Sequence, residues 1–98
     1  MAQFVYLIRP EREGFNEQMT NQEEQVMGRH FEYLQAKLEE GKLIMAGPCL
    51  DRAFGIAVFE AVDENEARAF MDDDPSIKEG VMKGELHPYR VSLLKPME

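Results

Sequence analysis

Two kinds of hydrophobic spacing alternate along the chain. Met27, Phe31, Leu34 and Leu38 recur at intervals of four, three and four residues, which places them on one face of a helix. Elsewhere the apolar residues form short runs in which both alternating positions are apolar, a pattern typical of buried strands. Taken in order, the two patterns predict strand, helix, strand, strand, helix, strand.

The strands are predicted from these short runs. In the third run, one alternating set is Phe54, Ile56 and Val58, and the other set (Ala57, Phe59 and Ala61) is also apolar. Pro88 lies inside the fourth run, and because proline cannot donate to a ladder, that strand is expected at an edge or with a bulge. Gly47-Pro48 is expected to end the second strand. The predicted strands are Gln3–Arg9, 42–46, 54–61 and 85–94.

The helices are predicted from their capping residues. Thr20 or Asn21 is expected to cap the first helix, with Glu23 placed as in a capping box, and Gly41 to end it. Asp63 is expected to cap a second helix, whose inner face is predicted to carry Ala67, Phe70 and Met71. A run of three aspartates before Pro75 ends this helix, because a residue preceding proline avoids the helical conformation. Asp74 is also a candidate cap for a short helical turn at 75–79.

This order of elements predicts an α+β domain with a ferredoxin-like βαββαβ fold, in which two helices cover one face of a four-stranded antiparallel sheet. The strands at 3–9 and 54–61 are apolar on both faces, however, and two helices cover only one. An exposed apolar sheet face is uncommon in monomers. The sequence therefore predicts a homodimer whose sheets pack face to face.

Composition limits the classes of partner. The 98 residues are enough for one domain, 1–98, with a single core. A net charge of −8 disfavours nucleic acid and anionic membrane surfaces, and no apolar run is long enough for a transmembrane helix. Cys49 is the only cysteine, which excludes an intrachain disulfide and fits a reducing cytoplasm. We expect a cytoplasmic protein.

His30 is the candidate functional residue on the first helix. It lies four residues after Val26 and four before Leu34, so it borders the apolar face. One interpretation is a hydrogen-bonded histidine that fills the seam between helix and sheet. The other is a general acid or base oriented by a carboxylate. Asp72, Asp73 and Asp74 are the obvious candidate carboxylates, but aspartates also gather at helix ends as caps, and spacing does not select among the three.

The remaining polar residues give weaker indications. Arg9, at the end of the first strand, is a surface charge unless it lines the same site as His30. His87 is expected to be exposed, and Cys49 is expected to be a small packed side chain. Cys49, His30 and His87 share no metal-ligand spacing, and no phosphate-binding glycine loop occurs. We predict neither a metal nor an organic cofactor.

In their order and spacing, several segments resemble the YCII-related (YciI-like) family. The resemblance covers nearly the whole chain, and its segments are Arg9 closing the first strand, 30–34 (HFEYL), 41–48 (GKLIMAGP), 54–56 (FGI), 74–81 (DPSIKEGV) and 85–93 (ELHPYRVSL). It implies a dimeric α+β barrel with a His–Asp pair in a cleft near the dimer interface. The matching positions are His30 and Asp74, whereas Asp72 and Asp73 have no family role.

The same resemblance implies an activity only in outline. Most members have no known reaction, some relatives remove HCl from chlorinated hydroxyaromatics, and dimeric barrels of this type include muconolactone isomerases and cofactor-free monooxygenases. The connection at 10–21 is longer than in the shortest members.

Two functions therefore stay open. In the first, a cofactor-independent enzyme uses His30 as general acid/base, Asp74 fixes its tautomer, and Arg9 binds an anionic oxygen of a small substrate. The reaction is then an elimination, a dehydrochlorination or an isomerisation, for instance of an aromatic ring. In the second, a non-catalytic dimer binds a small metabolite or serves as an accessory module. A cavity beside the pair favours the enzyme, and a pair without a cavity favours the module.

Overall fold

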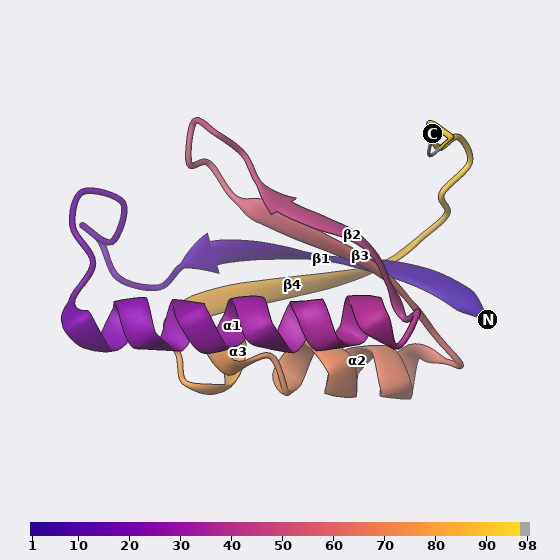
Figure 1. Ribbon diagram of the computed structural model, residues 1–98, viewed down its shortest axis with the longest axis horizontal. Coiled ribbons are helices and arrows are strands. Elements are labelled where there is room, and N and C mark those ends of the chain that lie inside the picture. The colour runs from indigo at the N-terminus through magenta and orange to yellow at the C-terminus, as the bar shows by residue number, and fades with distance from the viewer. Residues whose placement is uncertain (97–98) are drawn as a thin grey trace.

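The computed structural model describes residues 1–96 (Figure 1). Its four strands form one antiparallel sheet in the order β2-β3-β1-β4, and the helices all lie on one face of it (Figure 1). The predicted ferredoxin-like α+β arrangement is confirmed. The elements are β1 (Ala2–Pro10), α1 (Asn21–Glu39), β2 (Leu43–Pro48), β3 (Gly55–Ala61), α2 (Glu64–Asp72), α3 (Pro75–Lys78) and β4 (Met82–Tyr89).

The core lies between the helices and the sheet. Phe4, Tyr6 and Ile8 of β1 belong to it together with Phe59 of β3, and they share one face because side chains alternate along a strand. The rings of Phe59 and Phe70 stack with centroids 4.1 Å apart, which joins β3 to α2. The intervening side chains of β1 and β3 therefore point to the face that no helix covers.

The predicted caps are present. The backbone N–H of Glu23 donates to Thr20 Oγ1 at 3.1 Å, and the N–H of Thr20 donates to Glu23 Oε1 at 2.8 Å, so Thr20 begins α1 with a complete capping box. Gly41 follows α1 with a φ of 80°, a left-handed conformation that glycine adopts without steric cost. Asp63 begins α2, as expected. Local sequence is sufficient to define these helix ends.

The bounds predicted for β4 are wrong. The strand covers Met82–Tyr89 rather than 85–94, because it begins where Met82 enters the core and ends where the chain leaves the sheet. Beyond it, the N–H of Val91 donates to the side chain of Gln3 at 2.7 Å instead of to a strand backbone. Pro88 is accommodated because β4 is an edge strand, one of the two expected alternatives.

The predicted break at 47–48 is also wrong. Gly47 and Pro48 pair with Ile56 and Gly55, so β2 extends to Pro48. Since β2 is the other edge strand, a proline at its end leaves no ladder donor missing.

The apolar stripe of α1 is wider than its buried face. Leu34 is buried, as predicted, but Phe31 and Leu38 are 67% and 53% exposed. The helix packs on the sheet through a face that also includes Val26, which is fully buried. The stripe therefore leaves an apolar edge of α1 uncovered.

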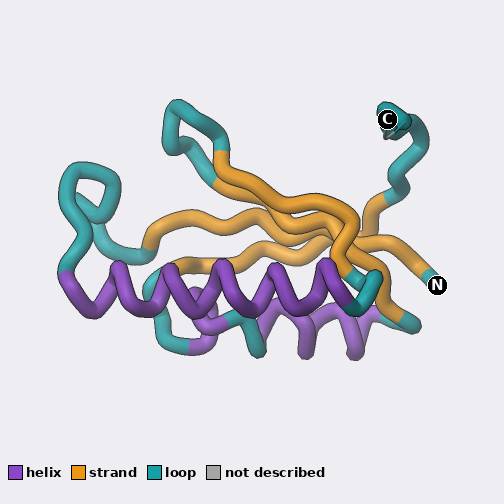
Figure 2. Tube along the Cα trace, viewed as in Figure 1, coloured by secondary structure: helices purple, strands orange, loops and turns teal. Residues whose placement is uncertain are grey.

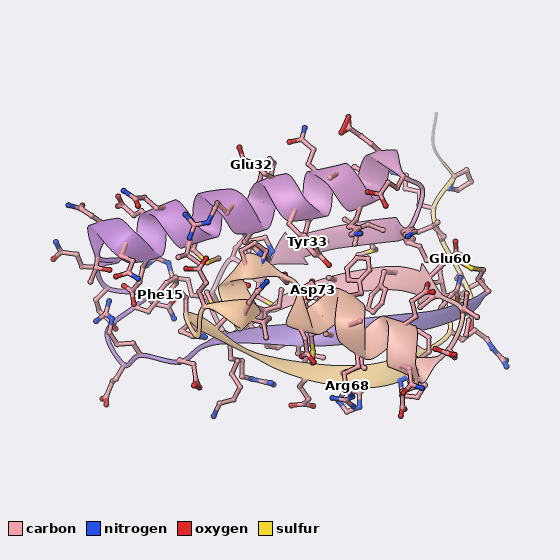
Figure 3. All side chains as sticks on the ribbon, turned by 90° about the horizontal axis from the view of Figure 1, so that it is seen from below. Phe15, Glu32, Tyr33, Glu60, Arg68 and Asp73 are labelled. Carbon is pink, nitrogen blue, oxygen red and sulfur yellow. The ribbon has the colours of Figure 1, made fainter. Side chains whose placement is uncertain are left out.

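The connection between β1 and α1 is held in place by its own side chains. Phe15 packs into the core (Figure 3). Arg12 donates to both carboxylate oxygens of Glu23 at 2.8 Å. The hydrogen bond from Arg12, helped by the backbone of Thr20, lowers the pKa of Glu23 to about 2.

Within residues 1–96, no helix combines the length and apolar character of a membrane span.

Candidate functional site

His30 and Asp74 meet between α1 and the start of α3. The Nδ1 atom of His30 lies 2.8 Å from Oδ1 and 2.9 Å from Oδ2 of Asp74. The Asp74 side chain is fully buried, and that of His30 is 15% exposed. The structure thus selects Asp74 from the three adjacent aspartates, since Asp72 and Asp73 are exposed.

Asp74 occupies this position because of its role in the backbone. It is the N-cap of α3, its Oδ1 accepts from the N–H of Ser76 at 3.0 Å, and Pro75 begins the helical turn. The cap turns the carboxylate inward beneath α1, where His30 projects from the middle of that helix. A local capping interaction therefore fixes one half of a long-range pair.

Two further side chains donate to the same carboxylate. Tyr6, from the centre of β1, donates its hydroxyl hydrogen to Asp74 Oδ2 at 2.7 Å. Ser76 donates its hydroxyl hydrogen to Oδ1 at 2.9 Å, and its Oγ lies 3.2 Å from Nδ1 of His30. Both residues are fully buried, so these donors replace the water that a carboxylate would otherwise bind.

These contacts keep Asp74 ionised. Burial by itself would raise the pKa of Asp74, but the hydrogen bond and charge of His30, with the donors from Tyr6 and Ser76, bring it below its ordinary value. Burial, followed by the Asp74 carboxylate, raises the pKa of Tyr6 far above its ordinary value. Tyr6 therefore remains a hydroxyl donor throughout the physiological pH range.

The partner of His30 also assigns its tautomer. An ionised carboxylate accepts hydrogen bonds but cannot donate, so the hydrogen of the neutral imidazole belongs on Nδ1. The lone pair is then on Nε2, the nitrogen directed away from Asp74. No described residue forms a hydrogen bond with Nε2. The arrangement leaves a basic nitrogen available for a ligand.

A cavity of about 790 Å³ adjoins His30. It lies between α1 and the half of the sheet formed by β2 and β3, and the uncovered apolar edge of α1, including Phe31 and Leu38, forms one wall. Its volume is in the range of cavities that hold small organic ligands. The lining is mostly apolar, with Asn16, His30, Gln35, Cys49 and Arg52 as the residues that carry polar or ionisable side-chain groups.

Arg9 does not lie with this pair. Its side chain is on the sheet face opposite to the helices, where Nη1 lies 3.2 Å from Oε1 of Glu85, and Arg9 is absent from the cavity lining. His87 is half exposed on that same face, with Nε2 2.5 Å from Glu85 Oε2. Cys49 is half-buried and lines the cavity.

Tyr6 and Ser76 were not among the residues predicted for the site. A tyrosine inside an apolar strand was the available signal for Tyr6, because a buried hydroxyl needs a hydrogen-bond partner. For Ser76 the signal was its place two residues after an aspartate cap, where side chains commonly bond to one another and to the backbone. Among the described residues, no group of three or more His, Cys, Asp or Glu is placed to hold a metal ion.

Comparison with known proteins gives a fold and a family. The fold is similar to that of 5-chloro-2-hydroxyhydroquinone dehydrochlorinase (TftG) from Burkholderia phenoliruptrix AC1100, solved in complex with 2,5-dihydroxybenzoquinone, with a TM-score of 0.66. The two sequences are 20% identical, and the match covers 89% of this chain and 93% of that chain. No match was found among curated proteins. Residues 2–86 match the family described as the YCII-related domain, and since this match spans most of its length, the chain belongs to that family.

Proposed function

We propose that the protein is a cofactor-independent enzyme in which His30 is the general acid/base and Asp74 its orienting carboxylate. The observation that carries the proposal is the contact of Nδ1 with both oxygens of a fully buried carboxylate, which directs Nε2 away from that carboxylate. An imidazole held in one tautomer by a carboxylate can accept a proton from a bound substrate and return it. Asp74 stabilises the imidazolium that forms when Nε2 takes a proton.

The reaction class is proton abstraction followed by elimination or isomerisation. Nε2 takes a proton from an acidic O–H or C–H group of the bound substrate. In an elimination the electron pair expels a leaving group such as chloride, and the net loss is HCl. In an isomerisation the imidazolium returns the proton to a different carbon. The similarity to a dehydrochlorinase, together with the apolar cavity, supports a small aromatic ring as the substrate.

The cavity beside His30 favours this function over a non-catalytic module. A purely structural His–Asp pair would be expected to lie in packed surroundings, whereas here the imidazole lines a cavity of about 790 Å³. Arg9 lies on the opposite face of the sheet, and that location does not support its predicted contact with a substrate in this cavity.

We also propose a homodimer formed through the uncovered sheet face. Leu7 and Ile56 are only half-buried there, and no helix of the same chain covers them. The chain after β4 projects from this side of the sheet and carries Leu93 with 94% of its surface exposed (Figure 1). A second copy would bury these apolar side chains.

Cys49 as the sole cysteine supports a reducing compartment such as the cytoplasm.

The experiment is a proton-abstraction assay on wild type, His30→Ala and Asp74→Asn. Small hydroxyaromatic substrates, including 5-chloro-2-hydroxyhydroquinone, are incubated without oxygen while chloride release and ring-proton exchange are followed. We expect wild type to exceed His30→Ala by about 10²–10⁴-fold, the usual contribution of a positioned general base. Asp74→Asn should lose much of the same activity, because an amide does not stabilise the imidazolium.

Folding of each variant is checked by circular dichroism, and His87→Ala is the matched control. His87 also contacts a carboxylate, but it lies on the other face of the sheet, so its removal should leave turnover unchanged. Equal activity in wild type and a folded His30→Ala variant would contradict the proposal and favour the non-catalytic module.

A further inference from the structure

The cavity beside His30 has an uneven distribution of charge. None of the described residues that line it is acidic, although 19 of the 98 residues in the chain are Asp or Glu. Apart from His30, the basic side chain in its lining is Arg52. Apolar walls with a single permanent cation create a local positive potential inside a protein whose net charge is −8.

Arg52 has a backbone conformation that glycine would adopt more easily. It lies in the turn that joins β2 to β3, and its φ is 68°. The N–H of Arg52 donates to the carbonyl of Cys49 at 3.0 Å, and the N–H of Cys49 donates to that of Phe54 at 2.8 Å, so the turn is well defined. Left-handed backbone at a residue with a side chain is strained, and such strain is concentrated at functional sites.

Two hydrogen bonds link Arg52 to Asn16, one through the side chain of Arg52 and one through its backbone carbonyl. Arg52 Nη1 donates to the carbonyl of Asn16, and Asn16 Nδ2 donates to the carbonyl of Arg52 at 3.2 Å. These bonds join the β2–β3 turn to the connection before α1, and both loops lie at the same end of the molecule (Figure 2). The side chain of Arg52 is exposed, and its hydrogen bond to Asn16 holds it beside the cavity.

Arg52 retains most of its binding capacity. The contact with Asn16 uses one of its several N–H donors. Arg9 and Arg29 each pair with a glutamate, but among residues 1–96 no carboxylate lies within ion-pair distance of Arg52. A guanidinium that is held beside the cavity and has unused donors is suited to bind a carboxylate through two parallel hydrogen bonds.

We propose that Arg52 is a specificity-determining residue that selects ligands carrying a carboxylate on an apolar ring system. The ring would lie between the walls near Phe31 and Ile8, with one end toward Nε2 of His30 and the carboxylate at Arg52. This inference rests on the proposed function, because it describes the ligand of the same site. Arg52 also lines a smaller neighbouring cavity whose lining includes Glu17, whereas the cavity beside His30 has no acidic side chain among the described residues, so the anion is favoured in the cavity beside His30.

The test compares two probes of the same shape, 2-naphthoate and 2-naphthamide, by isothermal titration calorimetry. Wild type should bind the carboxylate about tenfold more tightly than the amide, as expected for a charge-assisted hydrogen bond. Arg52→Gln should abolish this preference. Arg68→Gln makes the same charge change on α2, on the side away from α1, and should keep it (Figure 3).

Arg52→Gly separates binding from folding. Glycine relieves the left-handed strain, so this variant should melt at the wild-type temperature or above it, yet it should also lose the preference for 2-naphthoate. Equal affinity of wild type for the two probes, failure of 2-naphthoate to bind, or a preference that survives in Arg52→Gln would each overturn the proposal.

The outcome is independent of the proposed chemistry. Binding requires no proton transfer, so His30→Ala should retain the preference for 2-naphthoate. A preference that persists in a protein without turnover would count against the His30–Asp74 mechanism alone. Turnover that depends on His30, in a protein without the preference, would count against Arg52 alone.

Discussion

At the residue scale, Tyr6 connects the stability of the core to the chemistry of the site. Its ring packs against Phe59 and Phe70, with centroids 5.6 and 6.1 Å away, while its hydroxyl donates to Asp74. The same side chain therefore fills the core and satisfies a buried charge. Removing only the hydroxyl separates these two roles, because phenylalanine keeps the shape of the ring.

Tyr6→Phe should lower the free energy of unfolding by about 1.5–3 kcal/mol at neutral pH, the usual loss for a hydrogen bond to a charged group. Because the pKa of Tyr6 is raised in the folded protein, the stabilisation that its hydroxyl provides is complete below the ordinary pKa of 10.0. This stabilisation declines as the pH rises above that value, since only the unfolded chain then ionises. The difference between variant and wild type should consequently shrink at about pH 11. Urea unfolding at both pH values measures this.

The control for this prediction is Tyr89→Phe. Tyr89 is 51% exposed at the end of β4, so its hydroxyl should contribute little at either pH. A cost for Tyr6→Phe that stays constant from neutral to alkaline pH would mean that the hydroxyl does not act through its ionisation.

At the scale of the elements, two glycines have opposite structural roles. Gly84 lies in β4 directly beneath the helices, where an added Cβ would come within 2.8 Å of Met71 Sδ and 3.1 Å of Ile77 Cδ1. Gly28 lies on the exposed side of α1, and a Cβ there would meet nothing within 4 Å. One glycine permits close packing of a helix on a strand, and the other only weakens a helix.

Substitution of each glycine by alanine should therefore change stability in opposite directions. Gly84→Ala should destabilise by about 1–3 kcal/mol, because Met71 and Ile77 must move in a packed core. Gly28→Ala should stabilise by about 0.5–1 kcal/mol through helix propensity. Chemical denaturation of the two variants beside wild type is the measurement. Stabilisation by Gly84→Ala would show that β4 and the helices are less tightly packed than the structure indicates.

At the scale of the whole molecule, the helices cover one face of the sheet and leave the other to a proposed second copy. Leu7→Glu places a charge in the middle of that face and should convert a dimer into a monomer, because an unpaired charge is costly to bury. Light scattering should give twice the 11.3 kDa chain mass for wild type and once that mass for the variant.

Val62→Glu is the matched control for the dimer. Val62 follows β3 and is 64% exposed, so the same change of charge and apolar surface there should leave the dimer intact. A wild-type protein that remains monomeric at micromolar concentration would contradict the proposed assembly and would require another explanation for the apolar side chains around Leu7.

The sequence by itself determined the order of the elements and where the helices begin and end. Caps such as Thr20, Asp63 and Gly41 act over a few residues, so the helix ends that they define can be predicted without knowledge of the fold. The sequence also identified His30 as a polar residue that borders the apolar face of a helix. The resemblance of the chain to the YCII-related family indicated Asp74. The ends of β2 and β4 were misplaced because pairing with a neighbouring strand, rather than local preference, decides where an edge strand stops.

Only the tertiary structure decided how these residues combine. It joined His30 to Asp74 across 44 positions and Tyr6 to the same carboxylate across 68, and it left Asp72 and Asp73 in solvent. It also placed Arg52, rather than Arg9, at the cavity. The physical reason is that hydrogen bonds to a buried charge depend on which side chains share an enclosed space, and no local pattern of residues encodes that.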